Sequence, residues 1–276
     1  MSLLRLIARL DIKGRNVVKG IQMEGLRVVG DPAEMAKRYA ESGADEILYI
    51  DTVASLYGRN QLEALLEKTC EEVFVPITVG GGIQSIADAR RLFNAGADKV
   101  AVNTAALKRP ALINELAEHF GSQAVVVSIE AKRVNGGWEC YTDNGRERTG
   151  HDVLGWVSEA VMRGAGELLV TSIDLDGTRR GFDVDLISAI APHVSVPVTA
   201  SGGCGSLEHL RTVLSEGKAD AVAVGSALHY GIVSFEEMRE AAKPLLRHPL
   251  TLLPHPSPGV PEVASPEQRP KALRNG

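Results

Sequence analysis

The chain repeats itself at a fixed spacing. The segment VPITVGGGIQSIADARRLFNAGADKVAVNTAAL, which starts at Val75, aligns with VPVTASGGCGSLEHLRTVLSEGKADAVAVGSALH, which starts at Val196, with one inserted residue. GADEILYID from Gly43 likewise matches GAGELLVTS from Gly164, and LDIK at 10–13 matches IEAK at 129–132. The same offset of about 120 residues recurs through four expected strands. A duplicated (βα)4 half that closes on its copy predicts an eight-stranded barrel with pseudo-twofold symmetry.

Short apolar runs alternate with amphipathic stretches, a rhythm typical of a parallel sheet whose strands are joined by helices. We expect strands near residues 5–11, 46–51, 75–80, 98–103, 124–130, 167–173, 196–201 and 220–225. Helices are expected near residues 31–43, 59–71, 85–96, 109–119, 150–163, 184–192, 206–216 and 234–246. Eight such units within about 250 residues favour a (β/α)8 TIM barrel, since a doubly wound open sheet typically has fewer strands.

The expected barrel covers residues 1–247, with halves of about 1–122 and 123–247. The remaining residues, 248–276, show no periodic apolar face, and from Arg247 onward the chain holds seven of its thirteen prolines. We expect this Pro-rich tail to be disordered.

Composition excludes several classes of function. The net charge of -5 and the pI of about 5.9 leave no electrostatic footprint for nucleic acid or an anionic membrane, and no apolar run is long enough to span a membrane. The three cysteines lie far apart, which fits reduced thiols in a cytoplasm, and neither they nor the histidines have the spacing of a metal site. We therefore expect a cytoplasmic protein without a metal.

The active site of such a barrel lies at the carboxyl ends of the strands, where two glycine-rich turns occur. GGG at 80–82 and SGG at 201–203 each end a strand and precede a helix, so bare backbone N–H groups can bind a phosphate there. Either turn alone could simply be a tight turn, but two related copies favour two phosphate sites and an elongated bisphosphorylated ligand. The predicted phosphate-binding residues are Gly81, Gly82, Asn103, Thr104, Asp176, Gly177, Gly202, Gly203, Gly225 and Ser226.

Two acids end symmetry-related strands between these turns. Asp11 and Glu130 occupy matching positions of the two halves and are expected to face each other across the barrel mouth. Either acid alone could instead cap a helix or pair with a lysine, such as Lys13, Lys19 or Lys132. As a pair at the centre of a phosphate-bracketed site, they are interpreted as a general acid and a general base.

Several motifs resemble one known family. They are VVKGI at 17–21, GDPAEMAKRYAESGADEI at 30–47, TVGGGI at 78–83, DARRLFNAGADKVAVNTAA at 88–106, FGSQ at 120–123, TSIDLDGT at 171–178 and ASGGCGSLEH at 200–209. They look like the cyclase subunits of imidazole glycerol phosphate synthase, over residues 5 to about 232. The paired isomerase of the histidine pathway shares the doubled barrel and two acids but lacks the features that follow.

The resemblance implies a specific reaction. Ammonia adds to a bisphosphorylated ribulosyl aminoimidazole carboxamide ribonucleotide, which is cleaved and cyclised to imidazole glycerol phosphate and an aminoimidazole carboxamide ribotide. Asp11 and the residue at 130 are implied as the acid and base, and Lys19 is implied on a long first loop that closes over the substrate. No cofactor is implied.

In that family a glutaminase subunit docks on the amino-terminal face of the barrel and ammonia passes through the barrel core. The resemblance carries Asp98 and Gln123 over to the docking surface, and it carries four charges at strand starts over to an ammonia gate: Arg5, Glu46, Lys99 and Glu167. From the residues alone, these charges can also be a salt-bridged plug that stabilises the barrel end.

Three residues depart from the family pattern. The family has aspartate in place of Glu130, cysteine in place of Arg9 and threonine in place of Val53. Strand alternation predicts that Arg9 faces inward with Asp11, where a buried cation needs an acid as its partner. Two functions therefore stay open: the cyclase itself, and a cyclase-like paralog that channels ammonia to a sugar amidotransferase of surface glycan synthesis.

Overall fold

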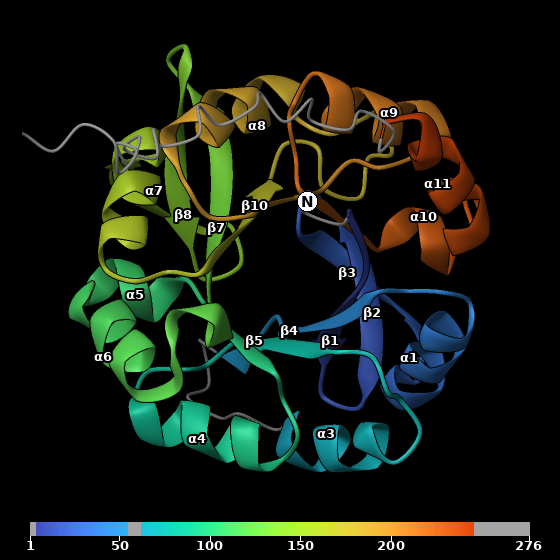
Figure 1. Cartoon of the computed structure of the whole chain (residues 1–276), viewed down its shortest axis with the longest axis horizontal. Helices are drawn as coiled ribbons and strands as arrows, with labels where there is room; N and C mark the ends of the chain where they lie inside the picture. Colours follow the sequence, from blue (N-terminus) through green and yellow to red (C-terminus); the bar gives the residue numbers. More distant parts are fainter. Residues whose placement is uncertain (1–3, 55–61, 246–276) are drawn as a thin grey trace, which may run out of the picture. The chain divides into compact units, whose positions relative to one another are not determined.

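A closed ring of parallel strands lies at the centre of the molecule (Figure 1). The structure is a computed structural model that describes residues 4–54 and 62–245. The ring closes because β12 pairs with β1 and β10 pairs with β7, all in parallel. Its strands are β1 (Arg5–Lys13), β4 (Glu46–Asp51), β5 (Ile77–Gly80), β6 (Lys99–Val102), β7 (Val125–Val134), β10 (Glu167–Ser172), β11 (Val198–Ser201) and β12 (Ala221–Val224). The predicted (β/α)8 barrel is confirmed.

Helices surround the strands and run back along the outside of the ring (Figure 1). Several begin at a side chain that accepts a hydrogen bond from a free N–H of the first turn, as Ser85 and Ser206 do at equivalent positions of the two halves. The longer helices are α1 (Pro32–Glu41), α3 (Leu62–Cys70), α4 (Ile86–Asn94), α6 (Ala111–Phe120), α7 (Val153–Met162), α8 (Val184–Ile190), α9 (Leu207–Ser215) and α11 (Phe235–Ala242). Shorter turns are α5 (Thr104–Lys108), α10 (Ser226–His229), η1 (Ser122–Ala124), η2 (Ala191–His193) and η3 (Lys243–Leu245).

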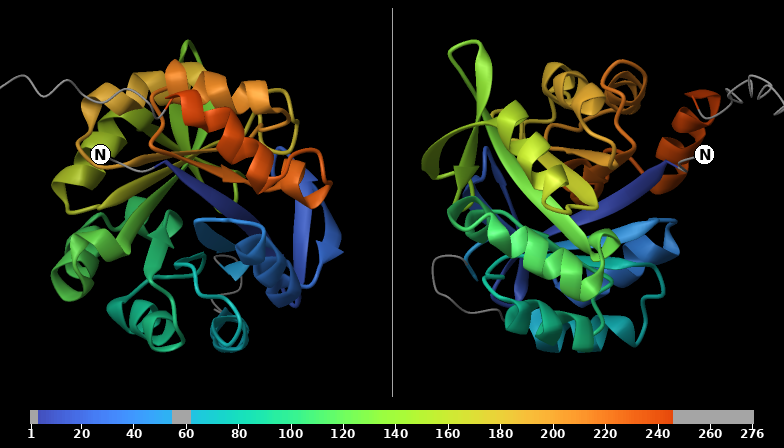
Figure 2. Two further views of the ribbon diagram at one scale, coloured as in Figure 1. Left: turned by 45° about the vertical axis from the view of Figure 1, so that its right-hand side comes forward. Right: turned by 60° about the vertical axis from the view of Figure 1, so that its left-hand side comes forward.

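Two antiparallel hairpins extend from the barrel at equivalent places, and the sequence pattern does not predict them (Figure 2). The first pairs β2 (Asn16–Ile21) with β3 (Glu24–Gly30), and the second pairs β8 (Gly137–Thr142) with β9 (Glu147–Asp152). The long loop expected after β1 is thus a hairpin. The helix expected from residue 150 begins at Val153, because residues 147–152 form β9. The hairpin strands mix polar and apolar residues without a clear apolar–polar alternation, so the sequence gives no strong strand signal there.

Alternation along the strands sends every second side chain into the barrel. One inward layer is entirely apolar: Ile7, Leu48, Ala101, Val126, Leu169, Ala221 and Ala223. The outward side chains pack against the helices in a second, larger core that includes Leu6, Tyr49, Leu92 and Trp156. The barrel interior is therefore packed, and the polar inward residues flank the apolar layer toward either end.

Four charged side chains form a ring at the amino-terminal end of the barrel. Arg5 donates to Glu46 and Glu167, both at 2.8 Å. Lys99 donates to the same two carboxylates at 2.8 and 3.0 Å. A threonine hydroxyl also donates to each glutamate, at 2.5 and 2.7 Å. The contact expected among these residues is confirmed, and the two cations neutralise two largely buried acids.

Each expected half, about 1–122 and 123–247, contributes four barrel strands and one hairpin. The expected barrel end at residue 247 and the Pro-rich tail at 248–276 lie outside the described residues. Within the described ranges, no helix is both long and apolar enough to cross a membrane.

We expect Lys99→Met to lower the free energy of unfolding by about 3 kcal/mol, because two largely buried glutamates would lose a cationic partner. Lys37→Met is the matched control, since Lys37 pairs with Glu72 on the exposed surface and such pairs contribute little. Urea unfolding of both variants at pH 7 measures the difference. Equally small effects would show that the ring does not stabilise the barrel.

Candidate active site

Asp11 is buried near the carboxyl end of β1, with a cation on each carboxylate oxygen. Arg9 Nε donates to its Oδ1 at 2.8 Å, and Lys19 Nζ donates to its Oδ2 at 2.8 Å. Each of the three side chains belongs to a residue that is only 5% exposed. The predicted pairing of Arg9 with an acid is confirmed. Asp11 also pairs with a lysine, the alternative that the sequence left open.

Lys19 lies on β2 and is held between two carboxylates. Besides Asp11, its ammonium contacts both oxygens of Asp176, at 2.9 and 3.1 Å. The loop expected to carry Lys19 is thus a hairpin strand. Asp176 does not fit the phosphate-binding role expected of it, because its carboxylate is bound to Lys19 and repels anions, and its N–H donates to the Ser172 carbonyl. The neighbouring Gly177 borders the second cavity, described below, and stays a predicted phosphate-binding residue.

Arg9 crosses the barrel mouth from β1 to two strands of the other half. Its Nη1 donates to the hydroxyls of Thr171 on β10 and Ser201 on β11, at 2.8 and 2.9 Å. Together with the salt bridges above, these contacts produce a buried cluster that we call the charge cluster: Arg9, Lys19, Asp11 and Asp176. Two cations and two acids balance, which satisfies the need of buried charges for partners.

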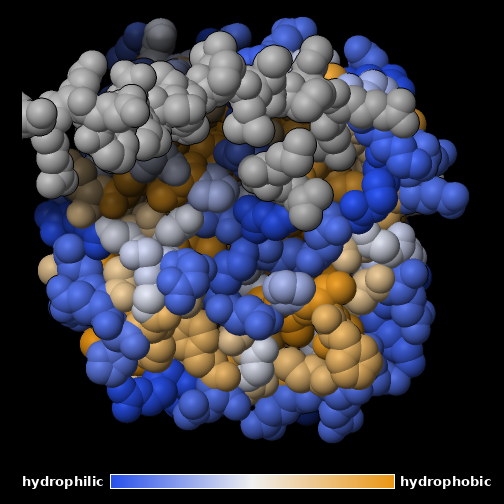
Figure 3. Space-filling view, in the orientation of Figure 1, coloured by the Kyte–Doolittle hydropathy of each residue, from blue (hydrophilic) through white to orange (hydrophobic). Residues whose placement is uncertain are grey.

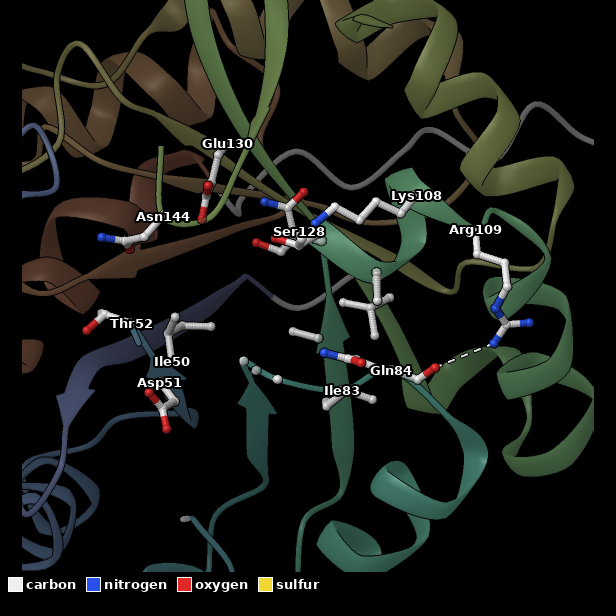
Figure 4. Close-up of a pocket in the computed structure, with 18 residues that line it drawn as sticks. Ile50, Asp51, Thr52, Ile83, Gln84, Lys108, Arg109, Ser128, Glu130 and Asn144 are labelled. Atoms are coloured by element: carbon white, nitrogen blue, oxygen red, sulfur yellow. Dashed lines mark hydrogen bonds between the residues drawn. The ribbon is translucent and has the colours of Figure 1, made fainter. Parts of the chain in front are cut away.

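Glu130 occupies the matching place on β7 in a different environment. Its Oε2 accepts a hydrogen bond from the Gly145 N–H at 2.8 Å, in the turn between β8 and β9. No salt bridge to Glu130 occurs among residues 4–54 and 62–245. Glu130 lines an open cavity of about 330 Å³, and Figure 4 shows its carboxylate directed toward this space. Asp11 is therefore enclosed by cations, whereas Glu130 borders the open cavity.

These surroundings give the two acids different affinities for a proton. Burial alone would raise the pKa of Asp11, but the charges of Arg9 and Lys19 outweigh burial and hold this pKa well below its usual range. Burial raises the pKa of Glu130 to about 7, and the Gly145 N–H and the charge of Arg9 oppose this rise only in part. Near neutral pH, Asp11 is therefore ionised, whereas Glu130 holds its proton to a higher pH than an ordinary glutamate.

The first predicted phosphate site forms a wall of the open cavity. The residues expected there line it together: Gly81, Gly82, Asn103 and Thr104. A side chain at Gly81 would meet the carbonyl oxygen of Asp51 at 2.5 Å, and the φ of 106° is one that favours glycine. The turn therefore brings bare backbone to the cavity wall, as a phosphate site requires.

Two cations of this cavity, Lys108 and Arg109, are missing from the residues predicted from sequence. Lys108 ends α5, the short helix that begins at Thr104, and Arg109 follows it. Both line the cavity, and Figure 4 shows Arg109 at its edge, where it donates to the Gln84 carbonyl at 3.5 Å. A Lys-Arg pair directly after a predicted phosphate turn is the signal that could have indicated them, since both side chains bind phosphate.

The second predicted phosphate site is nearly closed. Its cavity of about 10 Å³ is bordered by Arg9 and Lys19 and by the residues expected there: Gly177, Gly202, Gly203, Gly225 and Ser226. The Ser226 hydroxyl accepts a hydrogen bond from Arg179 at 3.0 Å, a further cation that the sequence pattern does not single out. An anion can enter this site only if the surrounding side chains move.

The sequence profile of a family described as "Histidine biosynthesis protein" matches residues 5–234. The chain belongs to this family. Imidazole glycerol phosphate synthase subunit HisF of Legionella pneumophila is 61% identical over 209 residues, which cover 75% of this chain and 99% of that protein. The subunit of the same name from Nostoc sp. is 48% identical over 239 residues, 85% of this chain and 92% of that protein. The one from Myxococcus xanthus is 49% identical over 243 residues, 88% and 94% respectively.

Membership of the histidine biosynthesis family confirms the resemblance seen in the sequence motifs. The alternative of a paralog that channels ammonia to a sugar amidotransferase is not favoured, because the relatives named above all carry the synthase subunit name. Of the three departures from the family pattern, Arg9 and Glu130 lie in the site. Val53 donates its backbone N–H to Asp51 at 2.9 Å, and nothing in the structure explains its side chain.

The chemistry available at this mouth is that of acids, cations and backbone amides. No group of three or more His, Cys, Asp or Glu side chains suited to a metal ion occurs in the part of the chain that the structure describes. The open cavity offers two glycine-rich or short-helix turns with Lys108 and Arg109 nearby, and it borders a carboxyl group whose pKa is raised toward neutral pH. Such a site can hold an anionic ligand and exchange a proton with it.

We expect Glu130→Gln to remove a pH dependence of stability. Between pH 4.5 and about 7 the folded protein keeps a proton on Glu130 that the unfolded chain has released, so the free energy of unfolding falls as pH rises through this window. The rise in pKa corresponds to at most about 3 kcal/mol. Urea unfolding at pH 5 and pH 8 should show a loss for the unmodified protein that exceeds the loss for the glutamine variant by about 1 to 3 kcal/mol. Equal losses would contradict the assignment.

Proposed function

We propose that this chain is the cyclase subunit of an imidazole glycerol phosphate synthase. In the proposed reaction, ammonia and a bisphosphorylated ribulosyl aminoimidazole carboxamide ribonucleotide give imidazole glycerol phosphate and an aminoimidazole carboxamide ribotide. The observation that carries the proposal is the family membership, together with 48–61% identity to subunits that bear this name. The absence of a membrane-spanning helix within the described residues is compatible with a cytoplasmic location, which we propose on the chemistry of the pathway.

Glu130 lines the first cavity and the two cations that hold Asp11 border the second, which supports a substrate with a phosphate at each end. One phosphate would bind at the turns of Gly81 and Thr104, where Lys108 and Arg109 add positive charge. The other would bind at the nearly closed site after the side chains there move. The central part of the ligand then lies beside the acid pair, where bond cleavage and ring closure require proton transfer.

The amino-terminal end of the barrel is proposed as the docking face of a glutaminase subunit. Asp98 and Gln123, carried over from the family, are both exposed, and Asp98 also accepts a hydrogen bond from the Ile77 N–H at 2.8 Å. Phe74, just before β5, is 89% exposed. Figure 3 views the molecule from the side on which the chain begins, and hydrophobic atoms gather in the lower half of this face. Exposed apolar surface of this kind marks sites of protein contact.

The charged ring is proposed as the ammonia gate between that face and the catalytic mouth. Ammonia is small and uncharged, so the apolar layer above the ring presents no electrostatic barrier to it. The ring itself is closed by salt bridges, and one member must swing aside for passage. Lys99 is suited to this movement, because its ammonium sits on a flexible four-carbon stem and its side chain is 16% exposed.

Turnover by the purified chain tests the proposed reaction. With the ribulosyl ribonucleotide and ammonium chloride, we expect formation of imidazole glycerol phosphate, followed by chromatography. Glu130→Gln should lower kcat at least about 100-fold, the usual range for a lost acid or base. Asp11→Asn should also lower kcat, because the buried cations Arg9 and Lys19 would lose the carboxylate that they share. No product, under conditions in which the Nostoc subunit forms it, would overturn the proposal.

Phe74→Asp tests the docking face. A charge at this exposed apolar position should raise the Kd for the glutaminase subunit of the same genome and lower the glutamine-dependent rate. The ammonia-dependent rate should stay unchanged and serves as the internal control. An undiminished glutamine-dependent rate at subunit concentrations near Kd would show that Phe74 lies outside the interface.

A further inference from the structure

We propose that Arg9 is a positioning residue that divides the work of the two acids: it keeps Asp11 a permanent carboxylate and leaves Glu130 as the group that exchanges protons. This inference deepens the proposed function and rests on it for its catalytic meaning. The division of protonation itself, however, is a property of the resting protein and can be measured without turnover.

The anchoring of Arg9 is the first argument. Its guanidinium is fixed at three points, to Asp11 on its own strand and to the hydroxyls of Thr171 and Ser201 on two other strands. A guanidinium does not lose its proton in proteins, so the cation beside Asp11 is present at every pH at which the fold exists. A residue held by three neighbours cannot easily turn away from its acid.

The engagement of Asp11 is the second argument. Arg9 occupies one carboxylate oxygen and Lys19 occupies the other, each at 2.8 Å. Protonation of Asp11 would remove the negative charge that both buried cations share: Arg9 would lose its ion-pair partner and Lys19 would keep only Asp176. Two other titratable groups lie near Asp11. Asp176 shares Lys19 with it, and His229, whose ring lies beside Gly225, has its pKa raised by the charge of Asp11 and lowered more strongly by burial. Asp11 is therefore built to remain ionised.

The surroundings of Glu130 suit both of its protonation states. The ionised form accepts the Gly145 N–H. The neighbouring Asn103 also favours the ionised form by a side-chain hydrogen bond that lowers the pKa of Glu130. The Asn103 Oδ1, which is buried without a hydrogen-bond partner among the described residues, can accept from the neutral form. The charged groups that act on Glu130 are Arg9 from β1 and Asp143 from the turn after β8, and their effects oppose each other. Because Glu130 also borders the open cavity, a ligand there can reach its proton.

Carboxyl carbon NMR tests the division directly. The full chain is enriched with carbon-13 at the aspartate and glutamate side-chain carboxyls and titrated from pH 4 to 9, with assignments from Asp11→Asn and Glu130→Gln. We expect one signal to titrate near pH 7 and to vanish in Glu130→Gln, while the Asp11 signal stays flat. In Arg9→Met the Asp11 signal should begin to titrate within this range and the Glu130 midpoint should rise.

Arg9→Lys and Arg163→Met complete the test. The lysine variant keeps a cation beside Asp11 and should keep its signal flat, even if Arg9→Met fails to fold. Arg163, at the end of α7, pairs with Glu159 away from the mouth, so Arg163→Met should leave both signals unchanged. Titration of Asp11 above pH 4 in the unmodified protein, or unmoved signals in a folded Arg9→Met, would overturn the inference.

The pH profile of kcat/KM then connects this division to catalysis. We expect one ionisation near pH 7 in the unmodified protein, an additional one in Arg9→Met with kcat lowered at least about tenfold, and recovery of the single ionisation in Arg9→Lys. A profile that Arg9→Met leaves unaltered would overturn the catalytic part. Absence of turnover in the unmodified protein, with the NMR result as expected, would instead overturn the proposed function and leave the division of protonation standing.

Discussion

Closure of the parallel strands is the constraint on which the rest of the molecule depends. The pairings of β12 with β1 and of β10 with β7 complete the ring, and alternation then sets which side chains point inward. Along β1, the inward positions run from Arg5 through Ile7 to Arg9 and Asp11, so one short strand contributes to the charged ring, the apolar layer and the catalytic mouth. The alternation that packs the barrel interior therefore also sets the positions of the charged and acidic side chains at both ends of the barrel.

Charge balance governs both ends of the barrel. The ring and the charge cluster each combine two cations with two acids, in keeping with the high cost of an unpaired buried charge. Glu130 departs from this rule, since it is half-buried beside the Gly145 N–H and the Asn103 side chain and lacks an ion pair within the described residues. Its pKa is therefore raised, so that it keeps its proton to a higher pH. A carboxyl group with a pKa close to the working pH is suited to proton transfer.

Features that repeat along the chain could be predicted from the sequence, whereas features that occur once could not. Strands and helices follow from periodicity and from the duplication, which shows most of them twice. The inward pairing of Arg9 follows from strand alternation, whereas the four residues of the charged ring came from the family resemblance. The hairpins and the burial of Lys19 do not follow, because weakly alternating polar strands look like loops and because a lysine in a loop is ordinarily solvated. Lys108 and Arg109 are absent from the predicted site, although they follow the predicted phosphate turn in sequence, because the pattern does not show that the end of α5 lies at the cavity wall. The sequence likewise does not show that the carboxylate of Asp176 is paired with Lys19.

The cavities at the two predicted phosphate sites differ in size, about 330 and 10 Å³, and this difference has a consequence for how a ligand would be oriented. A scaffold made of two equivalent halves cannot by itself distinguish the two ends of a molecule that carries a phosphate at each. Because the first cavity is open and the second is narrowed by Arg9 and Lys19, the two ends of such a ligand would meet different surroundings. The duplication makes the two halves of the barrel alike, and the few side chains that differ between them allow the barrel mouth to distinguish the two ends of a ligand.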